Sequence, residues 1–532
     1  MRERESFVGG ISLPILSASL LILAHPPFRL LLLPFVALVP LAFKLGSLSP
    51  GPGSGRKAAN LGLVFGLVYW GVLLVWVPLV VAPQFPWAYP GFLAQVGLLS
   101  GLTALMAWGT HRLHSVARLP LFLAFSLAWV SMEWFKAHFP LGLSFPWLGL
   151  GISLTSWPAL LGIAEWTGEG GVAFWLAGVN GVLATGVVAV VGERVRPGIF
   201  RRRWPTLVLA LLASFAPGVL GVFRARTLPL REGPVLAVVG TDVPRSLRLH
   251  PRESTVEGLA QVRRRLEDLD PGAADMVILP EATVSIPLDG IEGRVHLQAL
   301  GEMAARVHGP ILVGALGMGP GGTLRASGEL TNSAFLIGPD SVLSRRYDKV
   351  RMVPGMEWGG YSPGEAGVVF STSGFTLGPL ICYESLFGAL AREQVRAGAQ
   401  VLVNVSSDVW FGEGSRGFSS LFLHQHATHL VMRAVETRTG VARAANGGFS
   451  FLLGPTGERL SEILPPQGGM ALAAVPILSG STFFVRTGDL VGPGAVLSVI
   501  FLLIFSAIRA RRPGGLAAGQ DPRRGKASSR SA

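Results

Sequence analysis

The chain has 532 residues, which leaves room for two or three domains; half of them are hydrophobic, only 14% are charged, and the formal net charge is +13. Soluble domains carry about 25% charged residues, so this composition favours a protein that is largely embedded in a bilayer. The single cysteine, Cys382, excludes an internal disulfide and a cysteine-based zinc site.

Long apolar segments fill the first 223 residues, and another lies near the C-terminus. A helix needs about 20 predominantly apolar residues to cross the hydrocarbon layer. We therefore expect eight spans, near residues 7–24, 28–45, 59–82, 90–109, 118–135, 170–191, 204–223 and 489–508. The first segment runs directly into a second one and is not followed by a small-residue cleavage site, so we interpret it as a span and not as a cleaved leader.

The basic residues around these segments predict their orientation. Nineteen lysines and arginines border one set of alternate loops and chain ends, whereas the short loops of the other set have only Arg29 and Lys136. Arg224 and Arg226, just past the seventh span, run against this trend, but a long translocated domain weakens the rule there. The positive-inside rule then places both termini in the cytoplasm. We interpret the positive charge as a topology signal and expect no nucleic-acid partner.

This orientation divides the chain into four parts. We expect a membrane domain with seven spans at 1–223, an extracytoplasmic catalytic domain at 224–486, a C-terminal span at 487–510 and a disordered basic cytoplasmic tail at 511–532. In a bacterium, the catalytic domain then faces outward from the inner membrane.

The region 224–486 alternates short β-rich runs with segments of helical period. We expect helices at 256–269, 294–307 and 416–438, and strands at 235–239, 276–279, 311–315, 331–337, 341–347, 377–381, 401–405, 441–445 and 450–453. Gly338-Pro339-Asp340 predicts a hairpin between two of the strands. This pattern favours one layered α/β domain with helices packed on sheets.

Three polar residues follow apolar strands or the hairpin, where the edge of a sheet often carries a site: Glu281, Lys349 and Cys382. A thiol is a good nucleophile only as the thiolate, so it needs a base or a cation nearby. Glutamate can accept the proton, and lysine can stabilise an oxyanion. Each residue alone is weak evidence, because a lone cysteine is usually a small buried hydrophobe and the other two types are common in turns.

Three motifs resemble the signature regions of the nitrilase superfamily: Pro280-Glu281, the segment from Lys349 through Val353-Pro354 to Glu357, and Cys382-Tyr383-Glu384. Further stretches are similar to its membrane branch, the apolipoprotein N-acyltransferases: Phe145–Leu148, Asn404–Gly412, Arg433–Glu436 and Arg443–Gly448. The resemblance covers nearly the whole chain except the basic tail. One position departs from it, because Leu249 stands in a loop where this family often has tryptophan.

The resemblance implies an αββα-sandwich nitrilase-like α/β domain on the outer face of a multi-pass α-helical membrane domain of about eight spans. It implies Glu281 as general base, Lys349 as oxyanion-stabilising cation and Cys382 as nucleophile, with Glu357, Tyr383 and Glu384 as supporting residues. It also implies a membrane phospholipid as acyl donor, a diacylated lipoprotein as acceptor and no cofactor or metal. The expected activity is acyl transfer through a Cys382 thioester by a ping-pong mechanism.

Two other functions remain open at this point. A membrane-tethered amidase could use the same three residues with water as acceptor, and a transporter or scaffold could carry a degenerate outer domain. His424, His426 and His429 share a helical spacing, but no carboxylate cluster accompanies them, so we expect no metal site.

Overall fold

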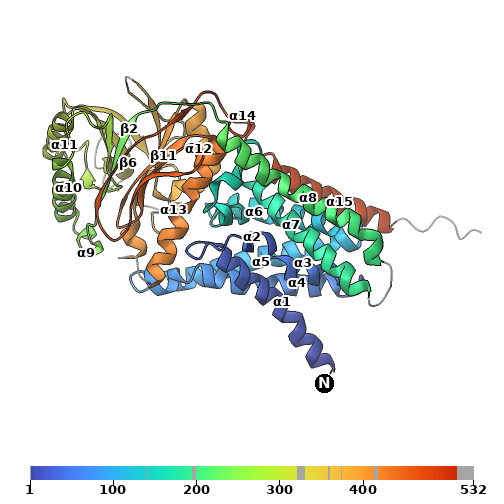
Figure 1. Ribbon diagram of the computed structural model, residues 1–532. Helices are drawn as coiled ribbons and strands as arrows, with labels where there is room; N and C mark the ends of the chain where they lie inside the picture. Colours follow the sequence, from blue (N-terminus) through green and yellow to red (C-terminus); the bar gives the residue numbers. More distant parts are fainter. Residues whose placement is uncertain are drawn as a thin grey trace, which may run out of the picture.

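The computed structural model describes residues 2–140, 142–193, 199–319, 330–357, 360–372, 374–412 and 417–511. Within these residues, a bundle of long apolar helices packs beside a domain of two β-sheets (Figure 1). Nearly all of the expected basic tail lies outside the described residues.

Seven long helices form the bundle: α1 (Arg2–Ala24), α4 (Ser54–Leu73), α5 (Ala88–Ser115), α6 (Leu121–Ala137), α7 (Ala164–Glu193), α8 (Ile199–Arg226) and α15 (Val491–Arg511). In the described part of the chain, five helical segments are long and apolar enough to cross a membrane: Ser54–Val81, Ala88–Ser115, Ala164–Val191, Val208–Arg226 and Val491–Ile508. Two shorter apolar helical segments, Ile11–Ala24 and Leu33–Gly46, accompany them. The chain therefore carries several helices that could span a membrane.

The expected span at 28–45 is two short helices, α2 (Leu33–Val36) and α3 (Val39–Gly46). Each has a proline in its first turn, Pro34 in α2 and Pro40 in α3. Proline is favoured in the first turn of a helix and cannot continue the hydrogen-bond ladder of a preceding one. The second proline therefore starts a new helix within the apolar segment.

The second part of the chain folds around two sheets. One sheet has the order β14-β2-β3-β5-β6-β7, with β4 also paired to β5. Its strands are β2 (Val235–Gly240), β3 (Met276–Ile278), β4 (Val284–Pro287), β5 (Ile311–Met318), β6 (Leu330–Ile337), β7 (Leu343–Asp348) and β14 (Gly469–Ala474). The other sheet has the order β13-β12-β11-β10-β9-β8. Its strands are β8 (Phe370–Ser371), β9 (Thr376–Ile381), β10 (Val401–Ser407), β11 (Gly440–Asn446), β12 (Ser450–Leu453) and β13 (Arg459–Ile463).

Apolar side chains define the layers of this domain. Leu236, Ile278 and Val403 belong to one buried cluster that joins the facing surfaces of the two sheets. A second cluster packs α10 (Pro251–Glu267) and α11 (Arg294–Val307) on the outer face of the first sheet. On the other side, α12 (Gly388–Arg396) and α13 (Gly417–Thr437) lie between the second sheet and the helical bundle (Figure 1). Two short helices, α9 (Arg245–Arg248) and α14 (Phe483–Thr487), also belong to this part of the chain. So does a pair of two-residue strands, β1 (Leu230–Arg231) and β15 (Ile477–Leu478).

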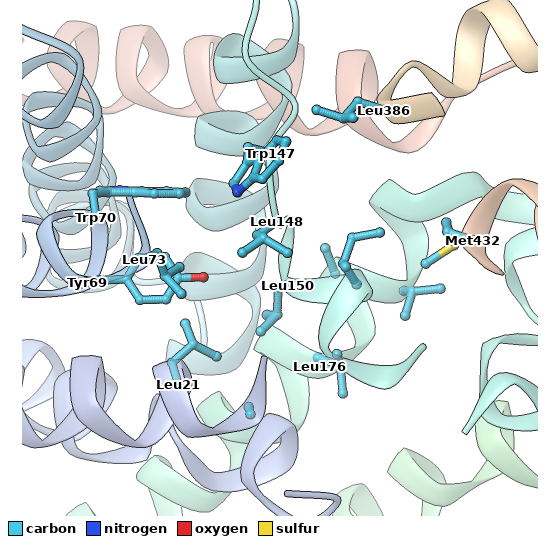
Figure 2. Close-up of a cluster of buried hydrophobic side chains, with 14 of the residues drawn as sticks. Leu21, Tyr69, Trp70, Leu73, Trp147, Leu148, Leu150, Leu176, Leu386 and Met432 are labelled. Atoms are coloured by element: carbon cyan, nitrogen blue, oxygen red, sulfur yellow. The ribbon is translucent and has the colours of Figure 1, made fainter. Parts of the chain in front are cut away.

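The loop between α6 and α7 joins the bundle to the sheet domain. Figure 2 shows Trp147 and Leu148 between Trp70 of α4 and Met432 of α13, in one buried cluster. The indole N–H of Trp147 also donates to Gln425 at 2.9 Å. The sheet domain is thus held against the apolar helices by packing and by hydrogen bonds.

Candidate active site

Cys382 lies directly after β9, at the start of a short 3-10 turn, and its φ is +50°. A residue with a Cβ adopts this left-handed conformation only where the surroundings impose it. Here the carbonyl oxygen of Cys382 accepts from the side-chain amide of Asn404 at 3.3 Å and lies 3.2 Å from Nε2 of His426. These contacts hold the backbone turn that carries the thiol.

Glu281 lies in the turn after β3. The next residue, Ala282, has a φ of +51°. The carboxylate of Glu281 is buried, with Oε1 accepting from Asn332 at 2.7 Å and Oε2 accepting from the backbone N–H of Ser407 at 2.8 Å. Ser407 is the last residue of β10, so the carboxylate bridges the two sheets. Its orientation is fixed by both of them.

Lys349 follows β7 and is only 1% exposed. Its Nζ lies 2.8 Å from Oε1 of Glu357 and 3.6 Å from Oε1 of Glu281. Burial would lower the pKa of Lys349, but the carboxylates of Glu357 and Glu281 outweigh burial and hold the pKa above its ordinary value. The lysine is therefore a permanent cation at neutral pH.

The charges of Glu281 and Lys349 both act on the buried thiol of Cys382. Burial and the carboxylate of Glu281 raise the pKa of the thiol, while Lys349 lowers it by a smaller amount. The resting site thus holds a neutral thiol beside a carboxylate and an ammonium group. The structure brings together all three residues that the sequence singled out.

Glu357, Tyr383 and Glu384, which we expected to support the site, lie around this cluster. Glu357 accepts from Lys349 and, through Oε2, from the backbone N–H of Val353 at 2.7 Å. The hydroxyl of Tyr383 donates to the carbonyl of Ser144, in the loop after α6, at 3.0 Å.

Glu384 fastens the turn that follows Cys382. Its carboxylate accepts hydrogen bonds from Ile381 N and Val350 N, both at 2.6 Å, from Arg351 N at 3.0 Å and from the hydroxyl of Tyr347 at 2.9 Å. Glu384 therefore ties the cysteine turn to the segment that carries the lysine.

Several site residues were not predicted from the sequence. Asn332 donates to Glu281 and, at 3.1 Å, to Glu357, so it spaces the two carboxylates around the lysine. Beneath the cysteine turn, Asp408 accepts from Arg443 at 2.7 Å and lies 3.1 Å from Nδ1 of His426. Burial would raise the pKa of Asp408, but Arg443 and His426 hold it well below its usual range. Asp408 and Arg443 lie in stretches that resemble the acyltransferase family, so the sequence contained a signal for them. Asn332 lies in none of these stretches.

An apolar cavity of about 390 Å³ reaches the thiol. Its lining includes Cys382 and Tyr383 of the sheet domain together with the aromatic residues Trp76, Trp87 and Phe92. Phe92 belongs to α5, one of the helices that could cross a membrane. The cavity therefore connects the cysteine with the apolar helical bundle, and its walls suit a hydrocarbon chain.

The three histidines of α13 have separate partners in the structure. His426 lies beneath the cysteine turn, His424 faces the carbonyl of Ser420 at 2.8 Å, and Nε2 of His429 accepts from Leu148 N at 3.4 Å. Among the described residues, no group of three or more His, Cys, Asp or Glu side chains is placed to hold a metal ion.

Leu249, the position that departs from the family resemblance, lies in the loop after α9 and is 70% exposed.

Comparisons with known proteins match both parts of the chain. The family model of the apolipoprotein N-acyltransferase N-terminal domain matches residues 17–182, and that of the carbon-nitrogen hydrolases matches residues 246–478. The chain is 28% identical to an apolipoprotein N-acyltransferase from Geobacter metallireducens, over 89% of this chain and 91% of that protein. It is 27% identical to one from Chlorobaculum tepidum, over 94% of this chain and 97% of that protein.

Solved structures align with part of the chain. An amidase from Nesterenkonia sp. AN1 aligns with 47% of this chain and 92% of its own chain, at 19% identity and a TM-score of 0.36. The two family models account for the apolar helices and for the sheet domain in the order in which they occur, and the relatives match nearly the full length. The chain belongs to the apolipoprotein N-acyltransferase family, with a catalytic domain of the carbon-nitrogen hydrolase type.

Proposed function

We propose that this chain transfers an acyl chain from a membrane phospholipid to the α-amine of the diacylglyceryl-cysteine of lipoproteins, the last step of lipoprotein maturation, through a thioester on Cys382. The observation that carries this proposal is the buried Glu281–Lys349–Cys382 cluster, whose cysteine lines an apolar cavity that residues of α5 also line. A water-soluble amide substrate has no need of such a cavity, whereas a lipid acyl chain fills it.

The first half-reaction acylates the enzyme. The carboxylate of Glu281 takes the proton of the Cys382 thiol, and the thiolate attacks the ester carbonyl of the phospholipid. The ammonium group of Lys349 stabilises the tetrahedral oxyanion. When the intermediate collapses, the C–O bond breaks, the lysophospholipid alkoxide takes the proton from Glu281, and a thioester remains.

The second half-reaction transfers the acyl group. The neutral α-amine of the lipoprotein attacks the thioester carbonyl, and Lys349 again stabilises the oxyanion. Glu281 accepts a proton from the amine, the C–S bond breaks, and the thiolate takes the proton back. An amide forms and the free thiol is restored, which makes the cycle ping-pong.

The supporting residues have positioning roles in this proposal. Glu357 and Asn332 hold Lys349 and Glu281 in place, and Glu384 holds the cysteine turn. Tyr383 can offer its backbone N–H to the oxyanion while its hydroxyl ties the turn to Ser144 in the loop after α6.

We also propose the membrane arrangement that this reaction needs. The membrane part comprises residues 1–223 and 487–510, with about eight spans, and the αββα-sandwich domain comprises residues 224–486. Both termini, including the tail at 511–532, lie in the cytoplasm of a bacterium, and the catalytic domain lies on the outer face of the inner membrane. The excess of basic residues in alternate loops supports this orientation.

An assay with the purified full-length chain tests the proposed function. The protein in phospholipid vesicles receives a synthetic diacylated lipopeptide, and mass spectrometry follows the gain of one acyl chain on the peptide amine. Conversion of the lipopeptide by the wild type and none by Cys382→Ala supports the proposal. Hydrolysis of short aliphatic amides without lipopeptide acylation would instead identify a membrane-tethered amidase.

A further inference from the structure

A second cavity, of about 430 Å³, lies between β1, the C-terminal ends of α12 and α13, and the segment that begins with β15. Its lining includes two arginines and four hydroxyl side chains, and no acidic side chain from the described part of the chain: Arg231, Arg438, Thr437, Thr439, Ser479 and Ser481. It shares no lining residue with the cavity that reaches Cys382. Such a set of cations and hydroxyl donors suits an oxyanion.

Arg438 is the buried cation of this cavity. Its side chain is 1% exposed, its Nε lies 2.7 Å from Oε2 of Glu165, and its Nη1 donates to the carbonyl of Pro455 at 3.4 Å. Its Nη2 is buried without a hydrogen-bond partner in the described structure. A buried guanidinium N–H without an acceptor costs free energy, and a negative charge in the adjoining cavity would offset part of that cost.

The charges around Arg438 do not balance. Glu165 is shared, because its Oε1 also lies 2.7 Å from Nε of Arg224. Two guanidinium groups thus share one bonded carboxylate. Glu458 acts on Arg438 more weakly than Glu165, and the exposed Arg231 at the cavity adds a third cation. An anion in the cavity offsets this excess.

Helices α12 and α13 also end at this cavity, and free carbonyl groups there would favour a cation. Backbone N–H groups already bond back to these ends: Ala399 N to Gln394 O at 3.1 Å, and Thr439 N to Ala434 O at 3.2 Å. The helix ends are therefore largely satisfied. The arginines remain the dominant charges.

The position of the cavity indicates where the anion comes from. Glu165 lies at the start of α7 and Arg224 near the end of α8, and both helices could cross a membrane. Ser479 and Ser481 lead through α14 into α15, and Figure 1 shows α14 between the sheet domain and the long helices. We propose that this cavity binds a phosphate-type oxyanion, supplied by the headgroup of an anionic phospholipid, at a site separate from the acyl-transfer site.

Native mass spectrometry of the full-length chain in detergent tests this site. The two probes are dihexanoyl phosphatidylglycerol, as a lipid phosphate, and sn-glycerol 3-phosphate, as a soluble one. Measurements are made in the Cys382→Ala background so that no lipid is consumed. Arg231→Gln removes an exposed cation of the cavity, and Thr439→Val removes a hydroxyl group. Arg345→Gln, which removes another exposed arginine on β7, is the control.

We expect the affinity for the lipid probe to fall at least fivefold in Arg231→Gln and in Thr439→Val, and to stay unchanged in Arg345→Gln. Weak binding of the soluble probe in all variants supports a lipid source. If Arg231→Gln weakens binding of the soluble probe but not of the lipid probe, the lipid assignment is overturned. Wild-type affinity of both probes for Arg231→Gln and Thr439→Val overturns the site itself. None of these outcomes depends on the thioester mechanism, because the nucleophile is absent.

Discussion

Nζ of Lys349 lies 2.8 Å from Oε1 of Glu357, closer than the 3.6 Å that separates it from Oε1 of Glu281. The lysine therefore has a permanent partner other than the proposed base. In the proposed mechanism, the positive charge of Lys349 therefore persists while Glu281 acts as the base. A cation of this kind is what an oxyanion requires in both half-reactions.

Replacing Glu357 with glutamine should weaken catalysis without removing any group that reacts. The pKa of Lys349 should fall and its position should loosen, because the nearer carboxylate is lost. A charge-assisted hydrogen bond contributes about 1.5–3 kcal/mol, so we expect a loss of roughly 10- to 100-fold in kcat/KM for lipopeptide acylation. Glu365→Gln, at an exposed position of the same segment, should keep full activity. Equal rates for the two variants would contradict the role of Glu357.

Replacing Glu281 with glutamine should have opposite effects on two measurements. Burial and the carboxylate of Glu281 raise the pKa of Cys382, so little thiolate exists at neutral pH and its fraction rises as the pH increases toward that pKa. Removing the negative charge lowers the pKa of the thiol, and alkylation by iodoacetamide at pH 7 should become severalfold faster. Acyl transfer should nevertheless be lost, because the base is absent.

The matched control for that experiment is Asp268→Asn, which removes an exposed carboxylate at the end of α10. It should leave both the alkylation rate and acyl transfer unchanged. Slower alkylation in Glu281→Gln than in the wild type would mean that the carboxylate does not raise the pKa of the thiol.

Glu436, on α13, should make stability depend on pH. Arg433 lies between two carboxylates, with Nη2 2.6 Å from Glu169 and Nε 3.2 Å from Glu436. Burial raises the pKa of Glu436 from 4.5 to about 8. Because the folded pKa is raised, the stabilisation is complete below about pH 4.5 and is lost as the pH rises through about 8.

We therefore expect the melting temperature of the wild type in detergent to fall between pH 5 and pH 8, and to fall less in Glu436→Gln. Glutamine keeps the shape of the protonated acid and cannot ionise. Glu393→Gln, at an exposed position on α12, is the control and should follow the wild type. The same pH profile in Glu436→Gln and the wild type would be inconsistent with a raised pKa at this position.

Filling the apolar cavity should block long acyl chains. Gly91 of α5 lines the cavity, and a Cβ atom placed there meets no atom within 4 Å. Gly91→Phe should therefore fold and project into the space, lowering kcat/KM for long-chain donors more than for short-chain donors. Gly97→Phe lies on the same helix, also with no atom within 4 Å, but not in the cavity lining, and it should behave as the wild type. Equal losses for both chain lengths would argue against an acyl-chain site.

Much of the sheet domain could be predicted from local pattern. The strand expected at 450–453 is β12, the helix expected at 294–307 is α11, and the expected hairpin joins β6 to β7. Short strands of weak β character were missed, such as β14, whose sequence is mostly glycine, alanine and methionine. It forms because it pairs along its whole length with β2, a contact between residues more than 200 positions apart.

The candidate residues Glu281, Lys349 and Cys382 could be chosen from the sequence, because each follows an apolar strand or the hairpin and lies within a motif. The geometry around them could not be predicted. Asn332 reaches both Glu281 and Glu357 only because β6 pairs with β5 in a particular register, with Leu316 opposite Asn332. Such a register depends on the packing of the whole domain and not on the residues beside Asn332.

The most direct test of this account is the intact mass of the purified chain after incubation with a phospholipid of one defined acyl chain and no lipopeptide. We expect the wild type to gain the mass of one acyl group, located at Cys382 and removed by hydroxylamine, and Cys382→Ala to gain nothing. Adding the diacylated lipopeptide should discharge the adduct. Lipopeptide acylation by a wild type that never carries the adduct, or by Cys382→Ala, would contradict the thioester mechanism.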